Sequence, residues 1–572
     1  MLSFSDLKKN LKKETTGLKH LKIALLADTA SQFIHTAIKG YGIELGLDLN
    51  IYEADYDQIE QQVYDPASDL YAFAPAYVII IRSTEHLLNK FYKQDDRPGF
   101  YNNILSETGN IYQHLTEKLS AKVVINTYVE INDQVFGSYA SKTTTSFLYQ
   151  LRKINIGLMD ISRENKDLHI TDLASLSSVK GYDHTFDPKM YISADMVFSI
   201  DFLPLIAQNI IQIIGSTLGN SKKCLILDLD NTVWGGIIGD DGMEGIQIGN
   251  LGIGKAFTQL QLWCRELKNR GIILAVCSKN TEHIAKEPFA DHPDMILTLD
   301  DITVFVANWE NKVDNIRYIQ QILNIGFDAM VFLDDNPFER EMLRFAIPDL
   351  TVPELPADPA DYLLFLRSLN LFDTASYTED DKHRTTQYQQ EAKRSILQKS
   401  FNNEQDYLKS LNMLSKVDSF DKFSIPRVAQ LTLRSNQFNL RTIRYTETAI
   451  AAISSSDEYF TLHFTLEDKL GDHGLIAVVI LKKQDISTLF IDTWIMSCRV
   501  LKRGMENFTL NHIIKIARSS GFAKIMGEYI PTAKNGLVKD HYKNLGFTPV
   551  GETWELQVDG LIEKENFIQQ KR

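Results

Sequence analysis

Between residues 224 and 232 the chain reads Cys224-Leu225-Ile226-Leu227-Asp228-Leu229-Asp230-Asn231-Thr232, an apolar run that gives way at once to two aspartates. A short, fully apolar run is typical of a buried parallel strand, and ligands bind at the carboxyl edge of a parallel sheet. Asp228 and Asp230 are therefore expected to face one crevice. An isolated Asp-x-Asp pair is equally compatible with a solvated turn, so residues elsewhere in the chain have to distinguish the two.

Further polar positions follow in an order that matches a single site. Ser278 follows the next apolar run along the chain, and Lys312 opens a segment whose apolar residues recur at helical spacing. Asp334 and Asp335 follow a third apolar run. Right-handed crossovers bring the ends of such strands to the same edge of the sheet. The sequence therefore predicts that these side chains meet Asp228.

These residue types favour phosphoryl transfer through a covalent aspartyl-phosphate. Asp228 is the expected nucleophile, and Asp230 is the expected acid that protonates the leaving group and then activates water. Carboxylates this close together need a cation. We therefore predict Mg²⁺ bound by Asp228, by the main-chain carbonyl of Asp230 and by Asp335, with Asp334 as a further candidate.

Two of the polar positions are expected to bind the transferred phosphoryl group. Ser278 and Lys312 would hold its oxygens, and Asp334 would orient Lys312 through an ion pair. Thr232 and Asn280, which lie in the same motifs, are candidate substrate-binding residues.

The motifs resemble those of the haloacid dehalogenase (HAD) phosphatase superfamily. More narrowly, the chain is similar to the FkbH-like family, HAD subfamily IIIC, in three segments: Asp-Leu-Asp-Asn-Thr-Val-Trp-Gly-Gly from Asp228, Cys-Ser-Lys-Asn from Cys277 and Asp-Asp-Asn-Pro-Phe-Glu-Arg from Asp334. The resemblance implies a phosphatase and glyceryltransferase. Such an enzyme removes phosphate from 1,3-bisphosphoglycerate and loads the glyceryl unit onto the phosphopantetheine thiol of an acyl carrier protein.

The spacing of the motifs leaves no room for a large cap domain. Ser278 lies 50 residues after Asp228, and Lys312 follows 34 residues later. The longer interval holds a Gly-rich flap (235–254), one helix and one strand. An uncapped crevice suits a bulky or protein-borne substrate, because no inserted domain closes over it. The expected partners are therefore a phosphorylated small molecule and an acyl carrier protein.

Cys277 is the cysteine nearest the predicted phosphate site, since it directly precedes Ser278. Glyceryl transfer through the enzyme would need a thioester on a cysteine, and Cys277 is the candidate. The competing interpretation is a buried, small apolar residue, which is the common place for a free cysteine. Direct transfer to the carrier thiol is a further alternative.

Residues 406–572 resemble a GNAT (GCN5-related N-acetyltransferase) domain. The run Arg499-Val-Leu-Lys502-Arg503-Gly504 opens an expected helix. The resemblance implies that main-chain N–H groups there cradle a pantetheine phosphate, and that Tyr542 protonates a thiolate. Lys502 replaces the family's first glycine, so Lys502 and Arg503 are instead expected to pair with the single phosphate of a carrier's pantetheine. A solvated basic helix start and a core tyrosine are the alternatives.

Residues 1–220 resemble an SGNH-like esterase fold. Lys22–Ala27 is followed by Asp28-Thr29, but the family's Gly-Asp-Ser is absent and no Asp-x-x-His is found late in the domain. We predict a parallel α/β module, SGNH- or flavodoxin-like, that binds a ligand or covers the HAD crevice. An active esterase is the alternative.

Composition agrees with several folded domains. The 572 residues carry a net charge of −14 and 4 cysteines without a Cys-x-x-Cys pair, which disfavours nucleic acid as a partner, a zinc ribbon and a disulfide framework. No apolar run is long enough for a membrane span, and the cytoplasm is the expected location. The expected fold is multidomain α/β: an SGNH-like domain (1–220), a HAD Rossmann-like domain (221–356), a connector (357–405) and a GNAT-like α+β domain (406–572).

Two other functions compete with glyceryl transfer. The first is a stand-alone HAD phosphatase that acts on a small sugar phosphate in polysaccharide biosynthesis. The second is a non-enzymatic scaffold, in which the Asp228 constellation is incidental.

Overall fold

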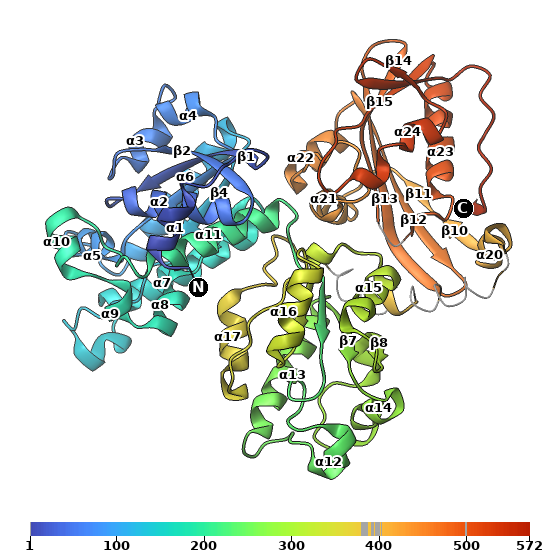
Figure 1. The fold of residues 1–572 in the computed structure, drawn as a ribbon. Helices are drawn as coiled ribbons and strands as arrows, with labels where there is room; N and C mark the ends of the chain where they lie inside the picture. The colour runs from blue at the N-terminus through green and yellow to red at the C-terminus, as the bar shows by residue number, and fades with distance from the viewer. Residues whose placement is uncertain are drawn as a thin grey trace. The chain divides into compact units, whose positions relative to one another are not determined.

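The computed structural model describes residues 2–378, 387–390, 394, 401, 403–497 and 500–571. By its internal contacts the chain divides into two compact units, Met1–Gly215 and Ser216–Arg572. One sheet lies in the first unit and two lie in the second (Figure 1). The fold class predicted from the sequence, a multidomain α/β chain with parallel sheets and an α+β C-terminal part, is confirmed.

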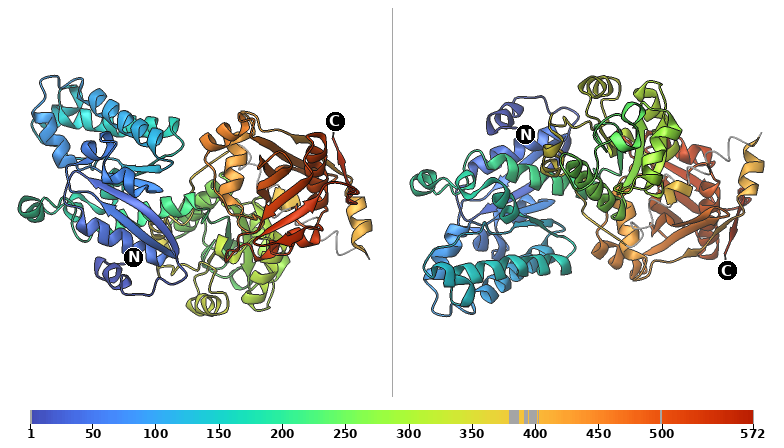
Figure 2. Two further views of the ribbon diagram at one scale, coloured as in Figure 1. Left: turned by 90° about the horizontal axis from the view of Figure 1, so that it is seen from above. Right: turned by 90° about the horizontal axis from the view of Figure 1, so that it is seen from below.

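The first unit is a parallel α/β layer. Its five strands pair in the order β2-β1-β3-β4-β5, and helices cover both faces of the sheet (Figure 2). Every residue of β3 is buried, because both sides of a central strand face a helical layer. The strands are β1 (Lys19–Ala27), β2 (Leu47–Glu53), β3 (Tyr77–Ile81), β4 (Lys122–Asn126) and β5 (Leu168–Thr171). The helices are α1 (Phe4–Asn10), α2 (Gln32–Glu44), α3 (Ile59–Tyr64), α4 (Asp69–Phe73), α5 (Thr84–Tyr92), α6 (Phe100–Lys118), α7 (Phe147–Glu164), α8 (Leu173–Lys180), α9 (Tyr182–Thr185), α10 (Pro188–Ala194) and α11 (Leu203–Thr217).

The second sheet carries the aspartate motifs. Its four parallel strands pair in the order β8-β7-β6-β9, which puts the motif strand β6 inside the sheet. Leu225 and Leu227 belong to the core on one face, whereas Cys224 and Ile226 belong to the core on the other, and this explains why the run is apolar throughout. The strands are β6 (Cys224–Leu227), β7 (Ile273–Ser278), β8 (Ile302–Ala307) and β9 (Met330–Leu333). The helices are α12 (Ile238–Gly245), α13 (Gly254–Asn269), α14 (Glu282–Asp291), α15 (Lys312–Leu323), α16 (Pro337–Ala346) and α17 (Tyr362–Leu369).

The third sheet is mixed, with both antiparallel and parallel strand pairs. Its main path runs β16-β17-β15-β14-β13-β12-β10-β18, and β11 pairs with β12. Strands β12, β13 and β14 form an antiparallel meander, after which α23 crosses over to make β15 parallel to β14. The strands are β10 (Met413–Ser415), β11 (Val417–Asp418), β12 (Tyr459–Asp468), β13 (Gly471–Lys483), β14 (Thr488–Met496), β15 (Lys524–Glu528), β16 (Thr548–Val550), β17 (Thr553–Gln557) and β18 (Ile568–Gln570). The helices are α20 (Glu404–Ser410), α21 (Ile425–Arg434), α22 (Glu447–Ser454), α23 (Met505–Ser519) and α24 (His541–Asn544).

Parts of the sequence prediction fall outside the described residues. The connector expected over 357–405 lies partly there, as do Cys498 and Arg499. In the described part of the chain, no helix combines the length and apolarity that crossing a bilayer requires.

Candidate functional site

Asp228 is the first residue beyond strand β6. Its main-chain N–H donates to the carbonyl of Leu333 at 2.9 Å, which holds the ends of β6 and β9 side by side. The residue is 6% exposed. Burial raises the pKa of Asp228, although the charge of Lys312 opposes this shift.

Lys312 connects two of the aspartates. It is the first residue of α15, directly after the N-cap Asn311. Its Nζ lies 3.0 Å from Oδ2 of Asp228 and 2.6 Å from Oδ2 of Asp334, and the three side chains are almost fully buried. Burial lowers the pKa of Lys312, but the two carboxylates outweigh it and raise the pKa above its ordinary value. The site therefore contains a buried, charged ammonium between two carboxylates.

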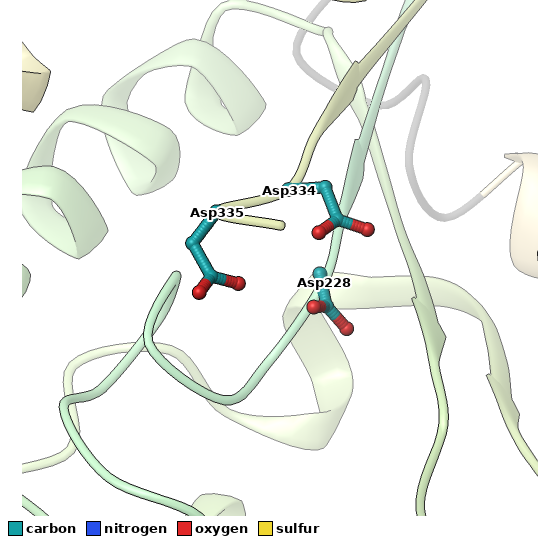
Figure 3. A group of neighbouring side chains, drawn as sticks. All are labelled: Asp228, Asp334 and Asp335. Carbon is teal, nitrogen blue, oxygen red and sulfur yellow. The ribbon is translucent and has the colours of Figure 1, made fainter. Parts of the chain in front are cut away.

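Three carboxylates lie close together. Asp228, Asp334 and Asp335 each offer an oxygen, and these atoms all lie within 4.8 Å of one another (Figure 3). Burial and the neighbouring Asp334 raise the pKa of Asp335. Lys312 forms ion pairs with two of these three acids, so a further positive charge fits the group, and hard oxygen ligands of this kind suit Mg²⁺.

Asp230 is held by three hydrogen bonds instead of joining this group. Its Oδ1 accepts from the indole Nε1–H of Trp234 at 2.9 Å and from the main-chain N–H of Ile238 at 3.0 Å. Its Oδ2 accepts from Nδ2 of Asn280 at 2.8 Å. These donors come from Trp234 just before the flap, from the flap itself and from the loop after β7, so the Asp230 carboxylate has a fixed orientation.

Hydrogen bonds connect the aspartates of the site to three neighbouring polar residues, Thr232, Ser278 and Asn280. Thr232 is fully buried, and its Oγ1 accepts from the main-chain N–H of Asp335 at 3.1 Å. The hydroxyl of Ser278 hydrogen-bonds to Asp228, and Asn280 donates to Ser278 Oγ at 3.2 Å. Thr232 and Asn280, which sequence analysis marked as substrate-binding, thus contact other site residues in this structure.

Sequence analysis missed a buried arginine under the metal carboxylates. Nη1 of Arg340 donates to the main-chain oxygens of Asp334 at 2.8 Å and of Asp335 at 2.6 Å. Arg340 is 4% exposed and forms an ion pair with Glu354. The segment that begins at Asp334 carried this arginine, but nothing in its spacing indicated that the guanidinium turns back onto the loop.

Glu339, which precedes Arg340 on helix α16, makes a second contact that supports the site. Glu339 is 5% exposed, and its Oε1 lies 2.5 Å from Nζ of Lys279, the residue after Ser278. Helix α16 thereby connects the loop after β7 with the loop after β9.

Comparison with solved structures identifies the family. The N-terminal part of protein BF1531 from Bacteroides fragilis, described as containing a phosphatase domain complexed with Mg, is 52% identical over 66% of this chain and 100% of its own, with a TM-score of 0.64. The family model for the FkbH N-terminal domain matches residues 22–215. This chain belongs to the FkbH family.

The other comparisons of this FkbH protein give weaker matches or none. Ribosomal-protein-S18-alanine N-acetyltransferase from Escherichia coli is 16% identical over 26% of the FkbH chain and 98% of its own, with a TM-score of 0.20. No curated protein matches the sequence significantly.

Cys277 of the FkbH protein lies inside strand β7 and is fully buried. Burial raises the pKa of its thiol, so the reactive thiolate is disfavoured. The geometry therefore gives no support to a covalent role for this cysteine and favours the alternative of a small apolar core residue.

The C-terminal candidates of the FkbH protein are dispersed. Arg499 lies outside the described residues, whereas Lys502 and Gly504 line a cavity of about 810 Å³ at the start of α23. Tyr542 is 1% exposed, and burial raises its pKa. Its ring packs so closely on Gly527 that a Cβ at Gly527 would lie 2.4 Å from the phenol. Tyr542 is thus part of the core, in line with the alternative interpretation.

The C-terminal part of strand β14, next to this core, pairs with an irregular segment of the chain. The main-chain N–H of Met496 donates to the carbonyl of Phe438 at 3.2 Å, and Asn439 forms an antiparallel bridge with Ile495. The segment 438–440, from the loop between α21 and α22, therefore pairs with the C-terminal part of β14, and on its other side the main-chain N–H of Ile530, just beyond β15, donates to the carbonyl of Leu440 at 2.9 Å.

Proposed function

We propose that this FkbH protein is a Mg²⁺-dependent phosphatase of the HAD type that works through an aspartyl-phosphate on Asp228. The observation that carries the proposal is the buried ammonium of Lys312, 3.0 Å from Asp228 and 2.6 Å from Asp334, inside a group of three carboxylates. The Mg²⁺-bound phosphatase domain of the Bacteroides fragilis relative, 52% identical, supports it.

Asp228, Asp334 and Asp335 are the side chains that would hold the metal, together with the main-chain carbonyl of Asp230. When bound, Mg²⁺ offsets the negative charge of carboxylates and phosphate. Lys312 supplies a further positive charge beside Asp228.

The residues then divide the chemistry between them. A carboxylate oxygen of Asp228 forms a bond to phosphorus while the bond from phosphorus to the leaving oxygen breaks. Asp230, held by Trp234 and Asn280, gives a proton to the leaving oxygen and later takes one from the water that cleaves the acyl phosphate. Lys312 and the hydroxyl of Ser278 stabilise the charge on the phosphoryl oxygens.

For the substrate, we propose 1,3-bisphosphoglycerate: Asp228 takes the 3-phosphoryl group, and the thiol of an acyl carrier protein displaces the 1-phosphate from the acyl carbon, which forms the glyceryl thioester and releases inorganic phosphate. Membership of the FkbH family supports this assignment, and so does the absence of a large cap insertion between Asp228 and Ser278. Because Cys277 is buried, direct transfer to the carrier thiol is preferred over an enzyme thioester. The proposed domain limits remain 1–220, 221–356 and 406–572, with a connector over 357–405, and the proposed compartment is the cytoplasm.

The first experiment tests the phosphatase itself. Asp228→Asn is expected to reduce Mg²⁺-dependent phosphate release by about 1,000-fold or more, because the nucleophile is lost. The matched control is Asp314→Asn, which changes an exposed aspartate on the same helix as Lys312 and should retain activity. Undiminished release by Asp228→Asn would show that Asp228 does not carry the reaction, and the Asp228 constellation would then be incidental.

The second experiment tests the substrate. After incubation with labelled 1,3-bisphosphoglycerate and a pantetheinylated carrier, the intact mass of the carrier should show a glyceryl adduct that Asp228→Asn does not form. An unmodified carrier, combined with rapid turnover of free sugar phosphates, would instead establish the stand-alone phosphatase.

A further inference from the structure

We propose that the unit Met1–Gly215 contains a second ligand site, which binds a neutral, hydroxyl-rich molecule of about monosaccharide size. The site is a cleft of about 470 Å³ lined by residues that follow the carboxyl ends of β1, β3 and β4. This volume lies within the usual range for small-molecule sites. The proposal is independent of the phosphatase function, because none of its residues belongs to the Asp228 site.

The position of the cleft follows from the strand order. In the sheet β2-β1-β3-β4-β5, the chain proceeds outward from β1 in one direction and from β3 in the other. Loops at such a switch point part from each other, and ligands bind in the crevice that forms there. Asp28 directly follows β1, Arg82 directly follows β3 and Tyr128 lies two residues beyond β4, and all three line the cleft.

The polar floor of the cleft is held in place by other side chains. Both oxygens of Asp28 accept from the main-chain N–H of Ser83 at 2.9 Å. The side chain of Asn126 accepts from the main-chain N–H of Arg82 at 2.8 Å and donates to its carbonyl at 2.9 Å. The loops after β1, β3 and β4 are therefore preorganised with respect to one another, which reduces the cost of ordering them on binding.

The charges around the cleft are close to balance. Arg82 Nη2 lies 2.9 Å from both Glu60 and Glu107, and Nε2 of His86 lies 3.1 Å from Asp195. The lining as a whole carries four acidic side chains, three basic ones and this histidine. The carboxylates would repel a phosphate and the cations would repel a polyamine, so the charge composition of the lining favours an uncharged ligand.

The shape of the lining points to hydroxyl groups on an apolar frame. Asp28, Arg82 and His86 offer acceptors and donors close together, and a hydroxyl group both donates and accepts. Ile59, Leu87 and Ile104 supply an apolar wall beside them, which matches the C–H face of a sugar ring.

Binding, not hydrolysis, is the activity expected of this cleft. Among the described residues that line the cleft, Ser83 is the one with a serine or threonine hydroxyl, and this residue is fully buried. Its Oγ accepts from the main-chain N–H of His86 as the cap of α5. It is therefore not placed to act as a nucleophile.

Saturation-transfer NMR on the full chain tests the proposal. The probes are glucose, galactose, N-acetylglucosamine and glycerol at millimolar concentration, with inorganic phosphate and spermidine as charged comparisons. Asn89→Trp should block the cleft, because Asn89 is an exposed lining residue on α5. Asn110→Trp, on an exposed position of α6 outside the lining, is the matched control.

At least one neutral probe should give a signal in the wild type and in Asn110→Trp, and this signal should fall at least 5-fold in Asn89→Trp. Phosphate release should be the same in all three proteins. The proposal is overturned if no neutral probe gives a signal, if the signal persists in Asn89→Trp, or if phosphate or spermidine displaces the neutral probes. None of these outcomes bears on Asp228.

Discussion

A single guanidinium supports both aspartates that follow strand β9. Arg340 donates from one nitrogen to the main-chain oxygens of Asp334 and Asp335. The hydroxyl oxygen of Thr232 accepts a hydrogen bond from the main-chain N–H of Asp335. The positions of the two carboxylates therefore depend on hydrogen bonds to their own main chain. Residues in such a supporting layer usually change metal affinity more than fold stability.

Arg340→Lys should weaken Mg²⁺ binding by about 10-fold, because an ammonium at this position loses the planar fork that meets two carbonyls and Glu354. Tryptophan fluorescence offers a readout without turnover, since Trp234 donates to Asp230 beside the site. Arg317→Lys, on an exposed position of α15, is the control. An unchanged Mg²⁺ titration for Arg340→Lys would show that Asp334 and Asp335 are positioned without it.

Asp28 is predicted to make the stability of the first unit depend on pH. Burial raises its pKa to about 7, above the ordinary value of 3.8 that applies when the chain is unfolded. The folded state then binds more protons than the unfolded state between these values, so stability falls as the pH rises. We expect the free energy of unfolding to drop by about 2–3 kcal/mol from pH 5 to pH 8 through this group.

Asp28→Asn should remove that slope, since asparagine offers the same acceptor to Ser83 without ionising. Urea unfolding at both pH values measures the effect. Asp55→Asn, at an exposed position in the same unit, should behave as the wild type. Equal slopes for Asp28→Asn and the wild type would contradict the assignment.

At the level of elements, several strands were predictable from local pattern. The apolar run 77–81 predicts a strand, which is found at Tyr77–Ile81, and the runs 272–277 and 329–333 predict strands that begin one residue later, at Ile273 and Met330. The pattern over 201–218 predicts a helix, which spans Leu203–Thr217. The pattern over 106–121 also predicts a helix, but this helix begins at Phe100, because its first turn packs Phe100 and Ile104 into the core beyond a proline-glycine turn.

The segment 438–440 was not predictable in this way. Asn535 fixes it by donating to the carbonyl of Asn439 at 3.0 Å and to that of Ile530 at 2.9 Å. His541 packs edge-on against Phe438 and Trp494, with ring centroids 4.9 Å and 4.6 Å away. An irregular segment held by side chains about 100 residues later has no periodic signature.

Asn535→Ala should destabilise the C-terminal sheet by about 2–3 kcal/mol, because two main-chain carbonyls lose a buried donor. Asn535 is fully buried, whereas Asn544, a few residues later, is exposed. Asn544→Ala is thus the control and should change stability by less than about 0.5 kcal/mol. Urea unfolding followed by near-ultraviolet circular dichroism measures both, and equal midpoints would refute the bracing role of Asn535.

For the whole molecule, the division into two compact units has a thermodynamic consequence. The candidate metal ligands all belong to Ser216–Arg572, and a ligand stabilises only the unit that binds it. Calorimetry should therefore resolve two transitions, of which Mg²⁺ raises one by several degrees relative to a metal-free sample while the other is unchanged.

Asp335→Asn should abolish this Mg²⁺ shift, and Asp314→Asn should retain it. A single transition that Mg²⁺ shifts as a whole would mean that the two units unfold together. A shift that survives in Asp335→Asn would place the metal away from Asp335.

The amino-acid sequence by itself determined the parallel layers and the set of polar residues at one sheet edge. Both follow from local rules: apolar runs make strands, and right-handed crossovers bring the ends of parallel strands together. Only the tertiary structure decided that Arg340 and Asn280 support the site, that Cys277 is buried and that the irregular segment 438–440 pairs with β14. These outcomes depend on which side chains meet after distant segments pack, and spacing along the chain carries no record of such contacts.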